Sequence, residues 1–214
     1  MQLSQFIDHT LLKPTATPKA IKQLCLEAIE HQFYAVCVNS CYVHLASETL
    51  QFERVKVAAT IGFPLGAMSA EAKVSEAIHC IQYGADEIDM VLNIGFLKAG
   101  LTKSVREEIS SIKKAIGEKV LKVIIETCYL NEPEIKLACE IAEKAGADFV
   151  KTSTGFGTGG ATLKDIQLMK ASIGPTMKIK ASGGITSGKE ALEYIAHGVS
   201  RIGTSSGIKL LKTQ

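Results

Sequence analysis

This sequence of 214 residues lacks a strong charge of either sign, a long hydrophobic run and a secretion signal. Its formal net charge is +2, which argues against a nucleic-acid surface or an acidic membrane patch as the main partner. No apolar run approaches the roughly 18 residues that a transmembrane helix requires, and residues 1–12 contain no uninterrupted hydrophobic stretch. We therefore expect a cytoplasmic protein with no nucleic-acid and no membrane partner.

Patterns that hold metals or disulfides are missing as well. The six cysteines form no CxxC pair and lie mostly in apolar stretches, as expected of reduced thiols that fill a core. The five histidines form neither an HExxH motif nor a close cluster. We therefore expect neither disulfides nor a metal site.

What the chain does contain is a regular alternation of short β-branched or apolar runs with longer stretches of helical periodicity. Thr17-Pro18 and a capping box from Ser187 to Glu190 predict two helix starts. Glycines at 84, 146 and 198 predict left-handed helix ends. The eight predicted strands span residues 6–11, 34–39, 55–61, 86–92, 120–126, 147–152, 177–182 and 200–204.

Eight strand-and-helix units of about 27 residues fill the chain and leave no room for a linker or a second domain. We therefore predict an α/β fold, a (β/α)8 TIM barrel formed by residues 1–214 as one domain. A doubly wound open sheet is the alternative. It often has a Gly-rich first turn, and no GxGxxG motif follows residues 6–11.

Charged residues recur at every second position of several predicted strands. Strand side chains alternate between the helix layer and the barrel axis, and the helix layer does not readily accept a charge. A barrel interior is normally filled by Val, Ile and Leu, so ammonium and carboxylate groups there are costly without a purpose. The predicted axial residues are Glu87, Asp89, Lys122, Glu126, Phe149, Lys151, Lys178, Lys180 and Ser182.

Three of these residues lie near the ends of their strands, where barrel enzymes carry out their chemistry. Asp89 and Lys151 each follow a helix-ending glycine by five residues, which predicts equal heights in the barrel. Lys180 lies just before the Ser182-Gly183-Gly184 turn. A structural salt-bridge network is the alternative for any one charge, and by default we assign charge pairing to the residues earlier in their strands: Glu87, Lys122 and Lys178. For Lys178 the alternative is that it simply reaches the solvent at the bottom of the barrel.

Two neighbouring lysines with a carboxylate suit a reaction that proceeds through an imine. A lysine with a pKa near 10.4 is neutral in only about one molecule in 2,500 at pH 7. A second ammonium about 5 Å away costs about 3 kcal/mol, equivalent to about two and a half pKa units. Lys151 and Lys180 on adjacent strands can therefore supply an amine nucleophile, while Asp89 moves protons and keeps the second lysine charged.

Glycine and serine follow the last two predicted strands, a location where barrels frequently bind phosphate. Gly183 and Gly184 come directly after residues 177–182, and Ser205 and Ser206 come after residues 200–204. Tight turning is the alternative explanation for the glycine pair. The loop at residues 152–160 can cover the same mouth of the barrel.

With these residues in view, the chain resembles the deoxyribose-phosphate aldolases, a family of class I Schiff-base aldolases. The resemblance covers essentially the whole chain and rests on residues 8–12 (DHTLL), 60–64 (TIGFP), 87–90 (EIDM), 151–156 (KTSTGF) and 180–185 (KASGGI). It implies reversible cleavage of 2-deoxy-D-ribose 5-phosphate to D-glyceraldehyde 3-phosphate and acetaldehyde, in deoxyribose phosphate catabolism. It also implies a homodimer and the absence of metal and organic cofactors.

The resemblance assigns roles to individual residues. Lys151 corresponds to the Schiff-base lysine, and Asp89 with Lys180 corresponds to the proton relay. Some members carry a lysine where this chain has Phe156, so phosphate binding here depends more on backbone and hydroxyl donors. The implied substrate-binding residues are Asp8, Thr10, Cys37, Thr152, Gly155, Gly183, Gly184, Gly203, Ser205 and Ser206.

Three alternatives remain at this point. Cys37 can be a packing residue, as buried cysteines often are. The chain can be another phosphate-binding barrel enzyme, such as a sugar-phosphate isomerase, in which Lys151 only stabilises charge. It can also be a non-catalytic sensor of a phosphorylated metabolite.

Overall fold

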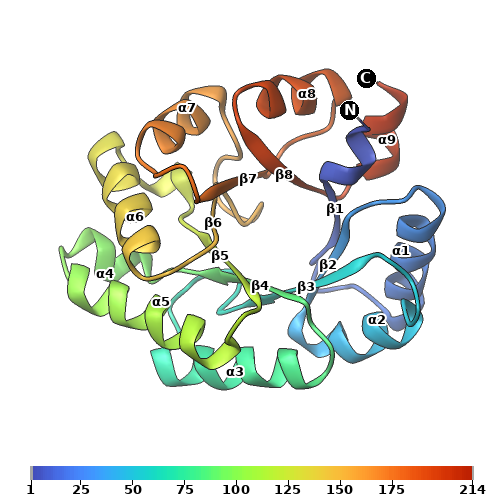
Figure 1. Ribbon diagram of the computed structural model, residues 1–214, viewed down its shortest axis with the longest axis horizontal. Helices are drawn as coiled ribbons and strands as arrows, with labels where there is room; N and C mark the ends of the chain where they lie inside the picture. The colour runs from blue at the N-terminus through green and yellow to red at the C-terminus, as the bar shows by residue number, and fades with distance from the viewer. Residues whose placement is uncertain (1, 214) are drawn as a thin grey trace.

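The eight predicted strands form one closed parallel barrel in the computed structural model, which describes residues 2–213. Strands that follow one another in sequence are neighbours in the barrel, and β8 pairs with β1 to close it (Figure 1). The (β/α)8 prediction is therefore confirmed, and the open sheet is excluded. The strands are β1 (Ile7–Leu11), β2 (Ala35–Asn39), β3 (Lys56–Ile61), β4 (Glu87–Val91), β5 (Val120–Ile124), β6 (Phe149–Lys151), β7 (Lys178–Ser182) and β8 (Val199–Thr204).

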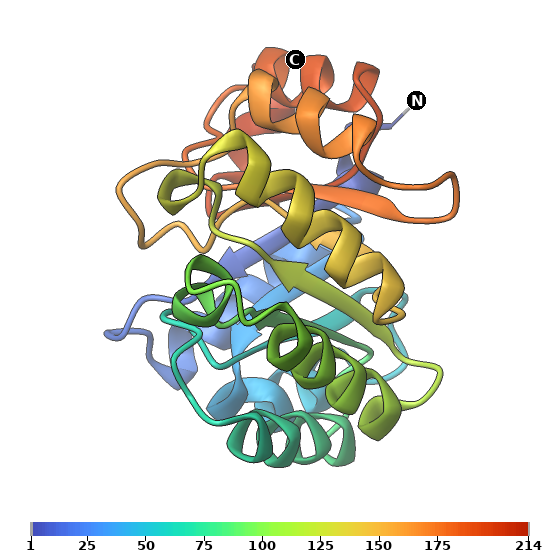
Figure 2. The same ribbon diagram turned by 90° about the vertical axis from the view of Figure 1, so that its left-hand side faces the viewer.

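Helices surround the strands on all sides, as Figures 1 and 2 show from two directions. Among the helices of residues 2–213, none is both long and apolar enough to span a membrane. The α-helices are α1 (Pro18–Glu30), α2 (Val43–Thr49), α3 (Ala70–Gln82), α4 (Ile94–Lys98), α5 (Thr102–Ile116), α6 (Glu132–Lys144), α7 (Leu163–Ala171), α8 (Gly188–Ala196) and α9 (Gly207–Lys212).

The main core lies between the strands and the helices. On β4, Ile88 and Met90 are fully buried in this layer, as the alternating pattern predicts. Burying one such side chain contributes about 1.5–3 kcal/mol to the free energy of folding. A smaller apolar cluster forms separately from Leu12, Cys37 and Ala58. The apolar faces thus fix which residues of each strand point to the axis.

Most of the predicted helix ends are confirmed. Thr17 caps α1 by accepting a hydrogen bond from the Ala20 N–H at 3.3 Å, and Pro18 is the first helical residue. The glycines at 84, 146 and 198 have φ angles of 99°, 88° and 95° and lie just beyond α3, α6 and α8. These positive angles explain glycine there, because a Cβ disfavours the left-handed conformation.

The predicted capping box at the start of α8 is wrong. Ser187 is the N-cap residue, but its side chain makes no capping hydrogen bond. Glu190, the expected partner, instead accepts a hydrogen bond from the Tyr194 hydroxyl at 2.8 Å. A capping box does form at α6, where Asn131 and Glu134 bond reciprocally. Local spacing identified the helix start, but the Glu190 carboxylate bonds a hydroxyl one turn further along the same helix.

Candidate active site

A cavity of about 360 Å³ opens at the carboxyl ends of the strands. Its walls come from the chain that follows β1, β6, β7 and β8, and Lys151 lies among its lining residues. The cavity therefore gathers segments that are more than 150 residues apart, as the closed barrel requires. Of the predicted substrate-binding residues, those that line it are Thr10, Gly155, Gly183, Gly184, Gly203, Ser205 and Ser206.

Lys151, Asp89 and Lys180 meet directly at one carboxylate oxygen. The Nζ atoms of both lysines donate to Asp89 Oδ2, each at 2.8 Å. The two amine nitrogens therefore lie within twice that distance of each other. Lys151 is 2% exposed and borders the cavity, whereas Asp89 and Lys180 are fully buried. The predicted arrangement of two lysines around one carboxylate is present.

The surrounding charges fix the ionisation of two of these groups. Burial alone would raise the pKa of Asp89, but the three ammonium groups around it hold that pKa well below its usual value. Burial alone would lower the pKa of Lys180, but the carboxylates of Asp8 and Asp89 raise it above its usual value. Asp89 is therefore a carboxylate and Lys180 an ammonium ion at neutral pH.

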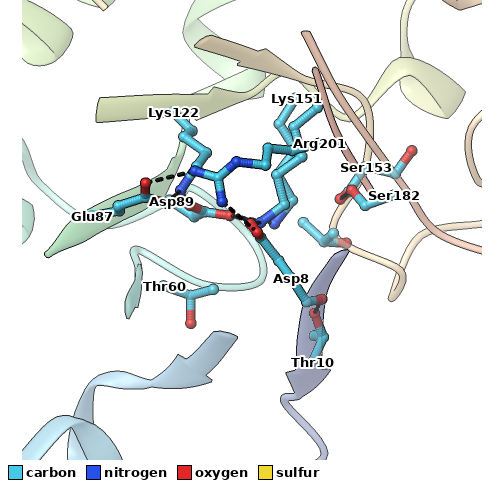
Figure 3. A network of polar contacts seen from close by, with 12 residues as sticks. Asp8, Thr10, Thr60, Glu87, Asp89, Lys122, Lys151, Ser153, Ser182 and Arg201 are labelled. Carbon is cyan, nitrogen blue, oxygen red and sulfur yellow. Dashed lines mark hydrogen bonds and ion pairs between the residues drawn. The ribbon is translucent and has the colours of Figure 1, made fainter. Parts of the chain in front are cut away.

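The charges continue as one connected set of buried ion pairs (Figure 3). Lys122 lies 2.6 Å from Glu87 Oε2 and 2.7 Å from Asp89 Oδ1, so the charge pairing predicted for Lys122 and Glu87 is confirmed. Lys180 also donates to Asp8. We call this set the buried ion cluster; its members are Asp8, Glu87, Asp89, Lys122, Lys151, Lys180 and Arg201.

Lys178 is not part of the buried ion cluster. It is exposed at the start of β7, and its Nζ lies 5.6 Å from the centre of the Phe149 ring. Lys178 therefore follows the alternative, reaching the solvent at the bottom of the barrel, and the charge pairing assigned to it by default is wrong. A cation over an aromatic face is favourable, so Lys178 helps to cover Phe149 at the amino-terminal end of the barrel.

Arg201 is a member of the buried ion cluster that the sequence analysis missed. Its guanidinium bridges two carboxylates, with Nη1 2.7 Å from Asp8 Oδ1 and Nη2 2.6 Å from Glu87 Oε1. It also stacks on Tyr34, with Cζ 3.3 Å from the ring centre. The same period-two rule on β8 was the available signal, since it places Arg201 in phase with Gly203.

Replacing Arg201 by lysine should destabilise the protein even though the charge is kept. A single ammonium cannot reproduce the planar fork that spans the carboxylates of Asp8 and Glu87. The loss of one charge-assisted hydrogen bond predicts a free energy of unfolding lower by about 1.5–3 kcal/mol. Urea unfolding of the variant would check this, with Lys178→Arg as the control for an exposed cation of the same barrel. An unchanged midpoint would contradict the bridging role.

Three predicted substrate-binding residues lie below or beside the cavity and do not line it. Asp8 belongs to the buried ion cluster, with its pKa raised by burial but lowered further by Lys180 and Arg201. Cys37 is fully buried, and burial raises the pKa of its thiol. Thr152 donates from Oγ1 to the Ser182 carbonyl and accepts from the Ser182 N–H, each at 3.0 Å. Thr152 thus joins the ends of β6 and β7.

The segments after β7 and β8 present amide and hydroxyl groups to the cavity. Gly183 and Gly184 have φ angles of 88° and 77°, which orient the backbone of this turn in a way that other residues rarely allow. Among the hydrogen bonds within residues 2–213, none uses the amide N–H groups of Gly183, Gly184 or Ser205. The Ser206 N–H, by contrast, donates to Thr204 Oγ1 at 2.9 Å. Ser206 can therefore offer only its hydroxyl.

The loop at residues 152–160 covers part of the mouth, as predicted, and it is held by a residue outside β5. The predicted strand at 120–126 is too long, because β5 ends at Ile124 and Glu126 adopts a φ of 53°. From this position the Glu126 carboxylate accepts hydrogen bonds from the N–H and the hydroxyl of Thr154. The Phe156 N–H donates to the same hydroxyl at 3.0 Å. Glu126 is therefore a loop anchor, and its prediction as an axial residue is wrong.

Phe156 gives the cavity an apolar side. Its ring meets Phe63 edge to face, with 5.4 Å between ring centres. Phe63 in turn packs on the apolar cluster that contains Leu12. The cavity thus has amide and hydroxyl donors on one wall and aromatic groups on another.

Within residues 2–213, no three His, Cys, Asp or Glu side chains are arranged to hold a metal ion. A closed barrel with two lysines and a carboxylate beneath its open end belongs to the class of TIM-barrel enzymes whose chemistry takes place at the carboxyl ends of the strands.

Comparison with known proteins narrows the class. Residues 3–212 match the family described as DeoC/LacD family aldolase. A deoxyribose-phosphate aldolase from Thermotoga petrophila is 56% identical over 206 residues, which cover 96% of this chain and 83% of that protein. A solved aldolase superposes with a TM-score of 0.95 at 44% identity, covering 99% of this chain and 95% of that one. The deoxyribose phosphate aldolase from Aeropyrum pernix, described as a tetramer, superposes with a TM-score of 0.90 at 35% identity, covering 98% of this chain and 89% of that one.

The chain therefore belongs to the DeoC/LacD family of aldolases. It is an aldolase, and hence a lyase, built on a TIM barrel. The resemblance stated from the sequence motifs is confirmed at the level of the family.

Proposed function

We propose that this aldolase cleaves 2-deoxy-D-ribose 5-phosphate reversibly to D-glyceraldehyde 3-phosphate and acetaldehyde, as part of deoxyribose phosphate catabolism. The proposal rests above all on Lys151, which borders the cavity while its Nζ shares Asp89 Oδ2 with Lys180. It is supported by the name of the Thermotoga petrophila relative. Lys151 forms the Schiff base, and no metal or organic cofactor takes part.

The first stage is attack of the Lys151 amine on the aldehyde carbon of the open-chain sugar. Lys180 remains an ammonium ion because of its two carboxylate partners, so it disfavours a second positive charge beside it. The nitrogen of Lys151 forms a bond to carbon, the carbonyl oxygen takes up one proton from that nitrogen and one from the Lys180 ammonium, and water leaves to give the iminium ion. Asp89, which touches both lysines, passes the proton from Lys180 and leaves the relay able to accept a proton in the next stage.

The second stage breaks the bond between C2 and C3. The iminium withdraws the electron pair of this bond while the C3 hydroxyl loses its proton to the Asp89 and Lys180 relay. D-glyceraldehyde 3-phosphate leaves, and the enamine of acetaldehyde remains on Lys151. Protonation of the enamine at carbon followed by addition of water releases acetaldehyde and restores the free amine.

The phosphate is held at the wall formed after β7 and β8. The amide groups of Gly183, Gly184 and Ser205 and the serine hydroxyls are the available donors there. Gly203 leaves space for the Lys180 side chain, because a Cβ at this position would lie 3.0 Å from Lys180 Cε. Thr10 borders the opposite part of the cavity and Gly155 its loop side.

Borohydride reduction in the presence of acetaldehyde tests the Schiff base directly. Reduction should add one ethyl group to Lys151, identified by mass spectrometry of the peptide, and should inactivate the enzyme. Cleavage of the phosphorylated sugar, followed with and without a chelator, tests substrate and metal independence together. An unmodified and fully active protein after reduction would exclude the imine mechanism, and a sugar-phosphate isomerase activity would then be the reaction to test.

Ser205→Ala should raise KM for the phosphorylated sugar while leaving kcat within about twofold. Loss of one hydrogen bond to a charged group costs about 1.5–3 kcal/mol, which predicts a KM higher by about tenfold or more. Steady-state kinetics would measure this change in KM, with Ser111→Ala, at an exposed position of α5, as the matched control. A fall in kcat at constant KM would count against a phosphate contact.

The homodimer and the cytoplasmic location stay predictions. We propose the dimer as the working form, and light scattering on the purified protein would test it. A monomer or a tetramer in solution would contradict it.

A further inference from the structure

His9 lies behind the phosphate-facing segment, on the outer face of β1. It is 4% exposed, and its Nε2 lies 2.8 Å from Glu27 Oε2 on α1. Its ring also packs against Phe33, with 5.0 Å between ring centres. The carboxylate accepts and cannot donate, so Nε2 carries the proton and fixes the orientation of the ring.

The start of α9 rests directly on this ring. A Cβ at Gly207 would lie 2.9 Å from His9 Nδ1 and 3.0 Å from Phe33 Cζ, so the backbone of Gly207 is in close contact with both side chains. Gly207 follows Ser205 and Ser206, which line the substrate cavity. The side chains of His9 and Phe33 therefore support this segment from behind.

A second cavity, of about 400 Å³, lies on the far side of this segment between α1 and α9, and Ser205 and Ser206 border this cavity too. The segment is thus a thin partition between two cavities, and His9 and Glu27 line the second one. Among the hydrogen bonds of residues 2–213, His9 Nδ1 makes none to residues 205–207, so the ring acts on this segment by contact, while the backbone of Thr204 lies beside the ring and opposes the lowering of the His9 pKa by burial.

We propose that His9, oriented by Glu27, is a positioning residue that sets the height of the Ser205–Ser206 segment and thereby the affinity for the phosphate end of the substrate. This inference rests on the proposed function, because His9 is inferred to support the segment that is proposed there to bind the phosphate. His9 does not touch the substrate, and it belongs to neither the buried ion cluster nor the lining of the substrate cavity.

The same geometry predicts a pH dependence. Burial lowers the pKa of His9 below its ordinary value of 6.5, although Glu27 opposes this shift, so the ring is neutral at pH 7. The neutral form therefore persists to a lower pH than in a free histidine and is lost only as the pH falls through this lowered pKa, when a second N–H appears at Nδ1 against Gly207. The charged and titratable groups that face the ring are Glu27 and His31 from the α1 side and Lys209 and Lys212 from α9.

The test compares the phosphorylated sugar with free 2-deoxyribose in His9→Ala, Glu27→Ala and Glu27→Gln. Both alanine variants should raise KM for the phosphorylated sugar by about tenfold, the size expected for losing one charge-assisted contact, with kcat within about twofold. Turnover of free 2-deoxyribose, which uses the same Lys151 but no phosphate wall, should be unchanged. Glu27→Gln keeps an acceptor for His9 Nε2 and should therefore retain most of the affinity for the phosphorylated sugar. The control is Glu30→Ala, at an exposed position of α1.

Each outcome decides the question. A KM effect confined to the phosphorylated sugar, with a wild-type rise of KM on acidification that His9→Ala lacks, supports the inference. Equal losses of activity with both sugars overturn the inference, because they indicate general damage to the fold. No change with either sugar also overturns it, because His9 then has no role in phosphate affinity. If the wild-type protein itself fails to cleave the phosphorylated sugar, the proposed function fails instead. Inorganic phosphate binding, measured by calorimetry, then decides the positioning role independently.

Discussion

Lys151→Ala should lower kcat for cleavage of the phosphorylated sugar by at least about 10⁴-fold, the scale on which removal of a covalent nucleophile acts. No neighbouring amine can replace it: Lys180 is fully buried and bonded to two carboxylates. The alanine side chain leaves a small space at the base of the cavity, so the fold should persist. A coupled assay for D-glyceraldehyde 3-phosphate measures the loss.

The matched control is Lys178→Ala, which removes an exposed lysine from the opposite end of the barrel. It should retain wild-type kcat and KM. Borohydride with acetaldehyde should label the control protein and leave the Lys151 variant unlabelled. Residual turnover above about one per cent in Lys151→Ala would contradict the role of this amine as the covalent nucleophile, because such losses usually exceed about 10³-fold.

Lys180→Leu should lower kcat by about 10²- to 10³-fold, within the range that general acid–base groups contribute. The variant also removes the positive charge beside the nucleophile, so the alkaline rise of the pH–rate profile should move to higher pH. Asp8 and Asp89 each lose a partner, and breaking a buried ion pair costs about 3–5 kcal/mol of unfolding free energy. Kinetics and urea unfolding on the same preparation separate the two effects.

Lys122→Leu offers a matched comparison, because Lys122 bonds the other oxygen of the same carboxylate, Asp89 Oδ1. Its loss should cost similar stability, since Lys122 is also fully buried. It should displace the pH–rate profile less than Lys180→Leu does, since Lys122 donates to a different oxygen from the one that Lys151 shares. Identical profiles in the wild type and in Lys180→Leu would refute the assigned electrostatic role.

The closed barrel could be predicted because its physical causes are local and repeated. Ile88 and Met90 alternate with Glu87 and Asp89, so one strand already shows which face meets the helices. The errors occurred where a side chain has two partners within reach. Glu190, for example, accepts a hydrogen bond from the hydroxyl of Tyr194, one turn further along α8, instead of completing the capping box.

The candidate site was likewise predicted in part. The period-two pattern predicts that Asp89, Lys151 and Lys180 point to the barrel axis, and the strand register then sets their heights along that axis. Arg201 was missed because the period-two rule was not applied to β8, and its stacking on Tyr34, which is far away in sequence, left no local signal. The roles of Thr152 and Glu126 depend on which backbone groups remain unpaired at the strand ends, and no residue pattern records that.

The buried ion cluster holds an odd number of charges, four cations against three carboxylates. If Lys151 attacks as a neutral amine, as we propose, three cations face three carboxylates, and Lys151 is the member of the cluster that lines the cavity. In that mechanism the iminium restores the surplus positive charge and the enamine removes it again. The charge count of the barrel would then favour movement of electrons from the breaking carbon–carbon bond towards nitrogen.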